Sequence, residues 1–175
     1  MLYLNILFIV VFSLYLYWIW GLLRALKSPA PYVPMRPEVV RALVALAEPK
    51  QGSIWVDLGS GDGRVLIEAC RRYDVKGIGI ERIGALRLLS RLTIWAFGLG
   101  KRIEIRRGDF FKTDLTKADV VSFYLLPVTS QELIPKLRRE LRPGAQILYH
   151  RFPIPGIVAE EKNSELKLYR AVAPF

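Results

Sequence analysis

The chain has 175 residues, 52% of them hydrophobic, and a formal net charge of +10 at pH 7. This length and apolar content favour one compact domain with a short appendage and exclude an intrinsically disordered chain. The sequence has one cysteine, Cys70, which excludes an intrachain disulfide. It has one histidine, His150, so a zinc site of the usual Cys/His kind is excluded as well, and we expect no metal. The positive charge indicates an acidic partner: anionic lipid, nucleic acid or an acidic protein surface.

The first segment is an uncharged, mostly apolar run from Leu2 to Leu23. At about 1.5 Å per residue, a helix of this length crosses the roughly 30 Å hydrocarbon core of a bilayer. Arg24 and Lys27 follow the run and no basic residue precedes it, which is the charge pattern of a cytoplasmic C-terminal side. We therefore predict a single-pass membrane protein whose remaining residues lie in the cytoplasm. The alternative is a hydrophobic helix that packs on the domain or in a dimer.

The segment from Ser28 to Pro37 contains four prolines. Prolines at this density favour extended backbone and act as a semi-rigid spacer. Pro37 also suits the first position of a helix, and apolar residues follow it at helical spacing. We therefore divide the chain into an N-terminal transmembrane anchor (1–27), a proline-rich connector with a leading helix (28–49) and one folded domain (50–175).

The folded domain alternates predicted strands with predicted helices. Short apolar runs bounded by glycine, proline or charged residues predict the strands, and apolar residues three or four apart predict the helices. Within the helices, Cys70, Trp95 and Phe97 are expected to face the core. The predicted strands are Ser53–Leu58, Val75–Ile80, Arg102–Arg107, Ala118–Leu126, Ala145–Phe152 and an antiparallel hairpin of Ile157–Glu161 with Glu165–Val172; the predicted helices are Arg64–Tyr73, Ile83–Phe97 and Gln131–Leu141.

Alternation of this kind predicts an α/β fold in which helices cover both faces of a parallel sheet. In such sheets ligands bind beyond the carboxyl ends of the strands, where the strand order reverses. The first of these ends is a glycine loop that leads into a helix. Glycines there permit a tight turn and let a ligand approach the backbone, although an ordinary strand–helix turn is the alternative. The loop reads Asp57-Leu58-Gly59-Ser60-Gly61-Asp62-Gly63.

Two further acids follow the next strands. Glu81 ends the second strand, where a carboxylate can accept hydrogen bonds from ribose hydroxyls. Asp109, with Phe110 beside it, follows the third strand and could accept from an adenine amino group. The glycines are spaced GxGxG, unlike the GxGxxG of dinucleotide sites, and Asp57 would repel a pyrophosphate. S-adenosylmethionine carries an ammonium, a sulfonium, a ribose and an adenine but no phosphate, so it matches these acids better than NAD.

The glycine loop, Glu81 and Asp109 resemble the first three motifs of the class I methyltransferases, over roughly residues 50–175. This resemblance implies a Rossmann-like sheet of seven strands with helices on both faces, and S-adenosylmethionine as the cofactor. The cofactor-binding residues that it implies are Asp57, Gly59, Ser60, Gly61, Asp62, Gly63, Glu81, Asp109 and Phe110.

A narrower resemblance adds the segments Pro31 to Pro34, Phe123 to Pro127, Leu137 to Gly144 and Arg151 to Pro155. Together they are similar to the small mitochondrial protein-lysine methyltransferases of the ATP synthase c subunit and the adenine nucleotide translocase, and to their archaeal relatives. The resemblance implies transfer of methyl groups to lysine ε-amines of a membrane or membrane-proximal protein, with membrane binding through the N-terminal helix.

Three side chains are candidates for the channel that receives the lysine: Tyr124 after the fourth strand, Tyr32 in the connector and His150 at the end of the fifth strand. Aromatic rings can hold a methylated ammonium by cation–π attraction. Plain packing is the alternative for either tyrosine, and His150 is expected to be structural or to contact the substrate rather than to act as a base. Burial of the lysine lowers its pKa, so no dedicated catalytic base is required.

Other functions stay open. A membrane-anchored methyltransferase could act on a lipid-like small molecule, and the basic charge would suit RNA. Against RNA, the sequence has no separate RNA-binding module and no basic patch interleaved with aromatic residues, so we expect no nucleic-acid partner. A scaffold that binds the cofactor without catalysis is a further alternative, and the intact acids and glycines count against it.

Overall fold

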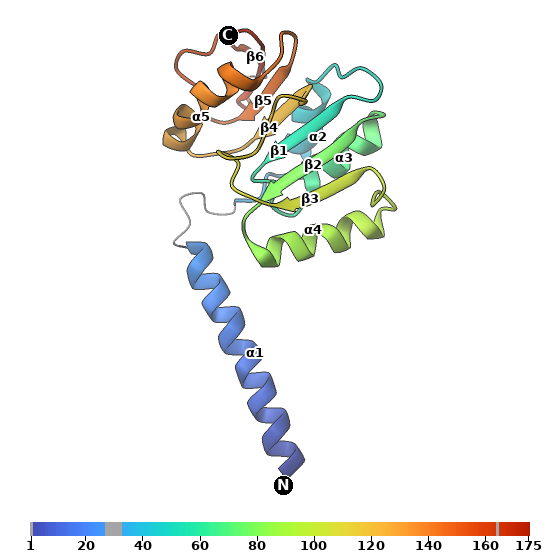
Figure 1. Cartoon of the computed structure of the whole chain (residues 1–175), viewed down its shortest axis with the longest axis vertical. Helices are drawn as coiled ribbons and strands as arrows, with labels where there is room; N and C mark the ends of the chain where they lie inside the picture. Colours follow the sequence, from blue (N-terminus) through green and yellow to red (C-terminus); the bar gives the residue numbers. More distant parts are fainter. Residues whose placement is uncertain (1, 27–32, 164) are drawn as a thin grey trace. The chain divides into compact units, whose positions relative to one another are not determined.

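The structure, a computed structural model, describes residues 2–26, 33–163 and 165–175 (Figure 1). The chain divides into two compact units, Met1–Val33 and Pro34–Phe175. The first unit contains the helix α1 (Leu2–Leu26), and the second contains the other described helices and the described strands. The site and the groove that follow both lie in the second unit.

The membrane-spanning helix predicted from Leu2 to Leu23 is not supported by the structure. Within the described part of the chain, no helix combines the length and the apolarity that a bilayer crossing requires. A crossing requires about 20 predominantly apolar residues in one helix. This finding overturns the prediction of a single-pass membrane location with a cytoplasmic domain.

The second unit is built on one mixed sheet, with strands β1 (Ile54–Leu58), β2 (Lys76–Glu81), β3 (Ile103–Arg107), β4 (Val120–Phe123), β5 (Gln146–His150), β6 (Glu160–Asn163) and β7 (Leu168–Val172). Their order is β3-β2-β1-β4-β5-β7-β6. β1 to β5 run parallel, and β7 pairs antiparallel with β5 and β6. The strand order therefore reverses between β1 and β4. This arrangement confirms the predicted α/β Rossmann-like fold.

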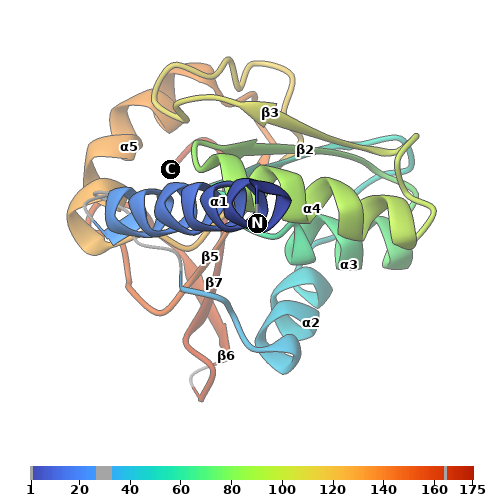
Figure 2. The ribbon, with the colours of Figure 1, turned by 90° about the horizontal axis from the view of Figure 1, so that it is seen from below.

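Helices α2 (Pro37–Ala45), α3 (Arg64–Arg72) and α4 (Gly84–Ala96) lie on one side of the sheet (Figure 2). A Cβ atom built on Gly77 of β2 would lie 3.3 Å from Leu66 and 3.5 Å from Cys70, so the glycine lets α3 pack closely on the sheet. Trp55 of β1 is fully buried in the same cluster. The prediction that Cys70 faces the core is confirmed, because its side chain is buried there.

The opposite face of the sheet is covered unevenly. Near β4 and β5, the rings of Phe123 and Tyr149 stack with centroids 5.7 Å apart and are buried. Helix α5 (Pro127–Glu140) follows β4 and buries its own apolar side chains outside the cluster formed by α2 and α3. Between β3 and β4, residues 108–119 contain no helix. On this face, Ile54 of β1 and Ile78 of β2 are consequently only half-buried.

Two predicted strands end earlier in the structure. β4 ends at Phe123 rather than at Leu126, because α5 begins at Pro127, whose fixed φ suits the first helical position. β5 ends at His150, since Arg151 takes a φ of 78° and leaves the strand. Both breaks lie at the carboxyl ends of parallel strands.

The prediction that Trp95 and Phe97 face the core is wrong. Their side chains are 79% and 52% exposed. The buried residues of helix α4 are Ser90 and Ile94. The apolar residues of this helix are more numerous than its single buried face can accommodate.

Candidate active site

The predicted site residues gather at the carboxyl ends of the parallel strands. β1 leads into the glycine loop, Asp57 to Gly63, and Glu81 is the last residue of β2. Asp109 lies in the loop after β3, Tyr124 follows β4 directly and His150 ends β5. Because β1 and β4 flank the point where the strand order reverses, these residues surround the position at which α/β sheets bind ligands.

The glycine loop requires glycine at three positions. Gly59, Gly61 and Gly63 have φ values of 78°, 56° and 82°, in the left-handed region that other residues rarely adopt. The amides of Gly59 and Ser60 donate to the carbonyl of Ile80 at 2.9 and 3.1 Å, which ties the loop to β2. The loop therefore follows a path that presents backbone rather than bulky side chains to a ligand.

Glu81 is turned back against the glycine loop. Its Oε2 accepts a hydrogen bond from the amide of Gly61 at 2.9 Å, and its Oε1 accepts from the amide of Ile83 at 2.7 Å. The residue is buried. A carboxylate has about four lone-pair sites, so Glu81 can accept further hydrogen bonds from a ligand while the two amides fix its orientation.

Asp57 is a buried acid at the end of a hydrogen-bond chain between β1 and β4. The indole N–H of Trp55 donates to Ser122 Oγ at 2.9 Å, and the Ser122 hydroxyl donates to Asp57 Oδ1 at 2.6 Å. Burial raises the pKa of Asp57 to about 7; the Ser122 hydrogen bond opposes this rise, and the carboxylates of Glu81 and Asp62 add to it. A bound cation would offset the cost of burying this carboxylate.

Two serines add polar groups to the site. Ser122 pairs in register with Asp57, and sequence reasoning missed it because a lone hydroxyl in an apolar strand gives no sign of its partner. Ser60, which was predicted, has a buried Oγ with no hydrogen-bond partner among the described residues. A buried hydroxyl of this kind calls for an explanation, and a bound polar ligand provides one.

Asp62 is engaged with the first residue of α3. Its carboxylate forms an ion pair with Arg64 at 2.5 Å, and the same guanidinium donates to the carbonyl of Met35 in the connector. This contact, which the sequence did not predict, holds the connector at the glycine loop.

Asp109 and Phe110 form the outer part of the site. The amide of Phe111 donates to Asp109 Oδ1 at 2.9 Å, and the Asp109 side chain is exposed. The rings of Phe110 and Phe111 lie against each other, with centroids 4.8 Å apart. An acceptor and an aromatic surface therefore lie side by side after β3.

Tyr124 and His150 form an aromatic pair where β4 and β5 end. Their ring centroids are 4.8 Å apart and the rings are tilted by 52°. The guanidinium of Arg151 donates to the Tyr124 hydroxyl at 3.3 Å. With its φ of 78°, Arg151 stores strain of about 1 kcal/mol or more, a feature that clusters at functional sites. Tyr32, the third residue predicted for this region, lies outside the described residues.

His150 is a neutral imidazole near pH 7. Burial lowers its pKa below the ordinary value; backbone groups of Lys167 and Leu166 oppose this, and the guanidinium groups of Arg151 and Arg36 lower the pKa further. Its Nδ1 atom is buried and has no hydrogen-bond partner among the residues that the structure describes. The end of β5 thus presents a polar but uncharged ring.

Comparison with known proteins identifies the family. The family model of the ANTKMT methyltransferase domain matches residues 57–161. A protein-lysine N-methyltransferase of Saccharolobus islandicus is 40% identical over 128 residues, which cover 72% of this chain and 79% of that protein. An adenine nucleotide translocase lysine N-methyltransferase of Mus musculus is 34% identical over 150 residues, which cover 82% of this chain and 65% of that protein.

Solved structures agree on the cofactor. An RNA methyltransferase of Salinibacter ruber in complex with S-adenosyl-L-homocysteine matches with a TM-score of 0.78 and 35% identity, over 81% of this chain and 94% of that chain. The acids after β1, β2 and β3 and the unpartnered Ser60 hydroxyl fit a cofactor with cationic and hydroxyl groups. The chain belongs to the ANTKMT methyltransferase family and is an S-adenosylmethionine-dependent methyltransferase.

Proposed function

We propose that the methyl acceptor is the ε-amine of a lysine in a protein, and that Tyr124 and His150 line the channel that receives it. The observation that carries the proposal is the aromatic pair at the ends of β4 and β5, which offers rings and a neutral imidazole instead of a carboxylate. Aromatic rings attract alkylated ammonium groups. The relatives from S. islandicus and M. musculus are named for methylation of lysine, which supports the same acceptor here. Tyr32 stays a prediction for this channel.

The cofactor is assigned to the neighbouring strand ends. In this proposal Glu81 accepts hydrogen bonds from the ribose hydroxyls, and Asp109 accepts from the adenine amino group with Phe110 beside the base. Asp57 attracts the ammonium group, and the glycine loop allows the amino-acid part to approach. When bound, S-adenosylmethionine supplies the methyl group and the sulfonium that activates it.

Transfer moves the methyl carbon from sulfur to the lysine nitrogen, so the amine must first lose a proton. Burial in an apolar channel lowers the pKa of a lysine, and a nearby positive charge acts in the same direction. Arg151 and Arg36 supply such charges, since both already lower the pKa of His150. The proton leaves to solvent as burial of the amine in the channel lowers its pKa. The residues of the channel then hold the nitrogen in line with the methyl group.

RNA is a second candidate acceptor. The S. ruber structure is described as an RNA methyltransferase, and it shares 35% identity with this chain. The basic net charge of +10 would also favour a polyanion. The two acceptors differ chemically, so one labelling experiment separates them.

The test is to incubate the full chain with methyl-labelled S-adenosylmethionine and with separated protein, RNA and lipid fractions of host cells. We expect label in the protein fraction, and mass spectrometry should locate it as methyl-lysine. Glu81→Ala, which should weaken cofactor binding at least about tenfold, serves as the control and should lower the signal when the labelled cofactor is limiting. Label confined to RNA or to lipid, with every protein lysine unchanged, would reject the lysine acceptor.

A further inference from the structure

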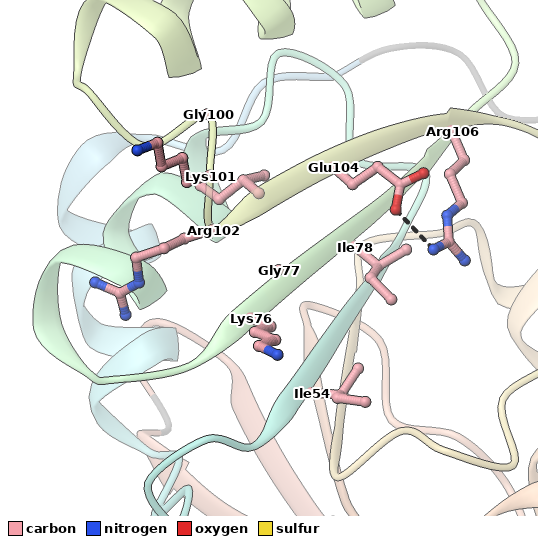
Figure 3. Close-up of a pocket in the computed structure, with 10 residues that line it drawn as sticks. Ile54, Lys76, Gly77, Ile78, Gly100, Lys101, Arg102, Glu104 and Arg106 are labelled. Atoms are coloured by element: carbon pink, nitrogen blue, oxygen red, sulfur yellow. Dashed lines mark hydrogen bonds and ion pairs between the residues drawn. The ribbon is translucent and has the colours of Figure 1, made fainter.

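A groove lies on one face of the sheet; it begins at the amino ends of β1, β2 and β3 and extends along β3 as far as Arg106, the next-to-last residue of that strand. Its volume is about 250 Å³ (Figure 3). Ile54, Lys76 and Ile103, the first residues of the three strands, all line it. None of the residues that line the groove belongs to the glycine loop, and neither Glu81 nor Asp109 lines it, so the groove is distinct from the predicted cofactor site.

The groove exists because the connection from β3 to β4 leaves part of one sheet face uncovered. This connection reaches only the carboxyl half of β2, where a Cβ atom built on Gly108 would lie 3.2 Å from Ile80. Two residues earlier on the same face, Ile78 is only half-buried, as is Ile54 on β1. α3 and α4 lie on the other side of these strands (Figure 2). Ile54 and Ile78 therefore form an apolar floor that no described helix covers.

The rim of the groove is basic. Four basic residues and one acid, Glu104, line it, and one of the four, Arg102, forms an ion pair at 3.6 Å with Asp74 outside the lining. Lys76 and Lys101 are exposed, and Arg106 forms an ion pair with Glu104 at 2.7 Å. Figure 3 shows Lys76 and Arg106 on either side of Ile78. The groove thus combines an aliphatic floor with a cationic rim.

The composition of the groove favours one kind of occupant. A second copy of the chain is disfavoured, because each copy carries a net charge of +10. Nucleic acid is disfavoured because none of the described lining residues is aromatic, and bases bind to single-strand sites largely by stacking. A polypeptide segment with acidic and aliphatic residues matches both the rim and the floor.

We propose that this groove is a second binding site for the protein acceptor, and that it holds an acidic, aliphatic segment of it. The proposal rests on the proposed function, because the segment in the groove belongs to the protein acceptor. An extended polypeptide advances about 3.3–3.6 Å per residue, so it needs roughly six residues to pass along the length of a strand. Short peptides around the target lysine would reach the active site but not Lys76 and Lys101 at the amino end of the groove.

The test uses the full chain and a fluorescent peptide of about 12 residues, long enough to exceed the length of a strand. The peptide alternates Glu or Asp with Ile or Leu and contains no lysine. Fluorescence anisotropy should show binding that weakens at high salt. Lys76→Glu combined with Lys101→Glu should weaken binding at least about tenfold, a loss of about 1.4 kcal/mol. The matched control, Arg41→Glu with Lys117→Glu, makes the same charge change at two exposed residues outside the groove and should change the affinity less than about twofold.

Several outcomes would overturn the proposal: no binding of the peptide to the unaltered chain, equal losses in both double variants, or binding of an RNA oligonucleotide that the peptide cannot displace. Cofactor affinity, measured on each variant, reports whether the fold is intact. The assay requires neither catalysis nor lysine. Peptide binding without methyl-lysine would therefore refute the protein acceptor and with it the role of the groove in acceptor binding. Methyl-lysine without peptide binding would refute the groove alone.

Discussion

The two ends of the same parallel strands differ in burial and charge. β2 shows the contrast within one element, because it begins at the exposed Lys76 and ends at the buried Glu81. At the carboxyl end, backbone amides hold Glu81, and the Ser122 hydroxyl holds Asp57. At the amino end, Lys76 and Lys101 stand exposed around an open groove. The two acids nearest the glycine loop, Asp57 and Glu81, are thus buried and oriented, whereas charges that steer a large partner can stay at the surface.

The largest expected effect is a loss of turnover on substitution of Tyr124, which follows β4 at the carboxyl end of the sheet. Tyr124→Ala should lower turnover about 100-fold, because a misplacement of about 1 Å in the reacting groups can cost that much. Cofactor affinity should stay within a few-fold, because the proposed contact of this ring is with the acceptor. Single-turnover transfer and calorimetry measure the two quantities separately. Tyr124→Phe keeps the ring and is the control; a parallel loss of cofactor affinity in Tyr124→Ala would move this residue into the cofactor site.

The next prediction compares how two acids, one from each end of the sheet, contribute to cofactor affinity. Glu81→Ala should weaken cofactor binding at least about tenfold, because hydrogen bonds to charged groups contribute about 1.5–3 kcal/mol each. Glu104→Ala, at the amino end, should leave cofactor affinity unchanged. Calorimetric titration of the full chain with S-adenosylmethionine provides both values. Equal affinities for Glu81→Ala and the unaltered chain would remove Glu81 from the site.

The last effect concerns the pH dependence of stability. Burial raises the pKa of Asp57 to about 7, whereas in the unfolded chain it is about 3.9. Between these values the folded state binds more protons than the unfolded state, so the free energy of unfolding should fall as pH rises, by at most about 1.4 kcal/mol per pH unit. Asn has no titrating carboxyl group, so Asp57→Asn should lack this contribution to the pH dependence of stability. Urea unfolding of the cofactor-free chain at several pH values should therefore show that the free energy of unfolding falls less steeply with pH in Asp57→Asn. Identical slopes for the variant and the unaltered chain would contradict a raised pKa for Asp57.

Local patterns in the sequence predict the strands and the acids of the active site. The strand predicted at Ser53–Leu58 is observed at Ile54–Leu58, and the loop that follows it is marked by its glycines. Glu81 and Asp109 are recognisable because each stands where an apolar or alternating run ends. Such signals need only the residue and its neighbours in the chain.

Features that depend on distant parts of the chain could not be predicted in this way. Ser122 meets Asp57 only because β1 and β4 pair in one register. The positive φ of Arg151 depends on the hydrogen bond from its amide to the carbonyl of Lys167, in the segment that leads to β7. The groove is visible only once the connection from β3 to β4 is known to carry no helix. The exposure of Trp95 likewise follows from which face of α4 meets the sheet.

The contact of Arg64 with two segments has a kinetic consequence. Its guanidinium pairs with Asp62 in the glycine loop and donates to the carbonyl of Met35 in the connector. A shift of the glycine loop on cofactor binding would therefore act on the connector at Met35 through the Arg64 guanidinium. We therefore expect an ordered addition, with the cofactor first and the protein acceptor second, and a methylated product that departs before the spent cofactor.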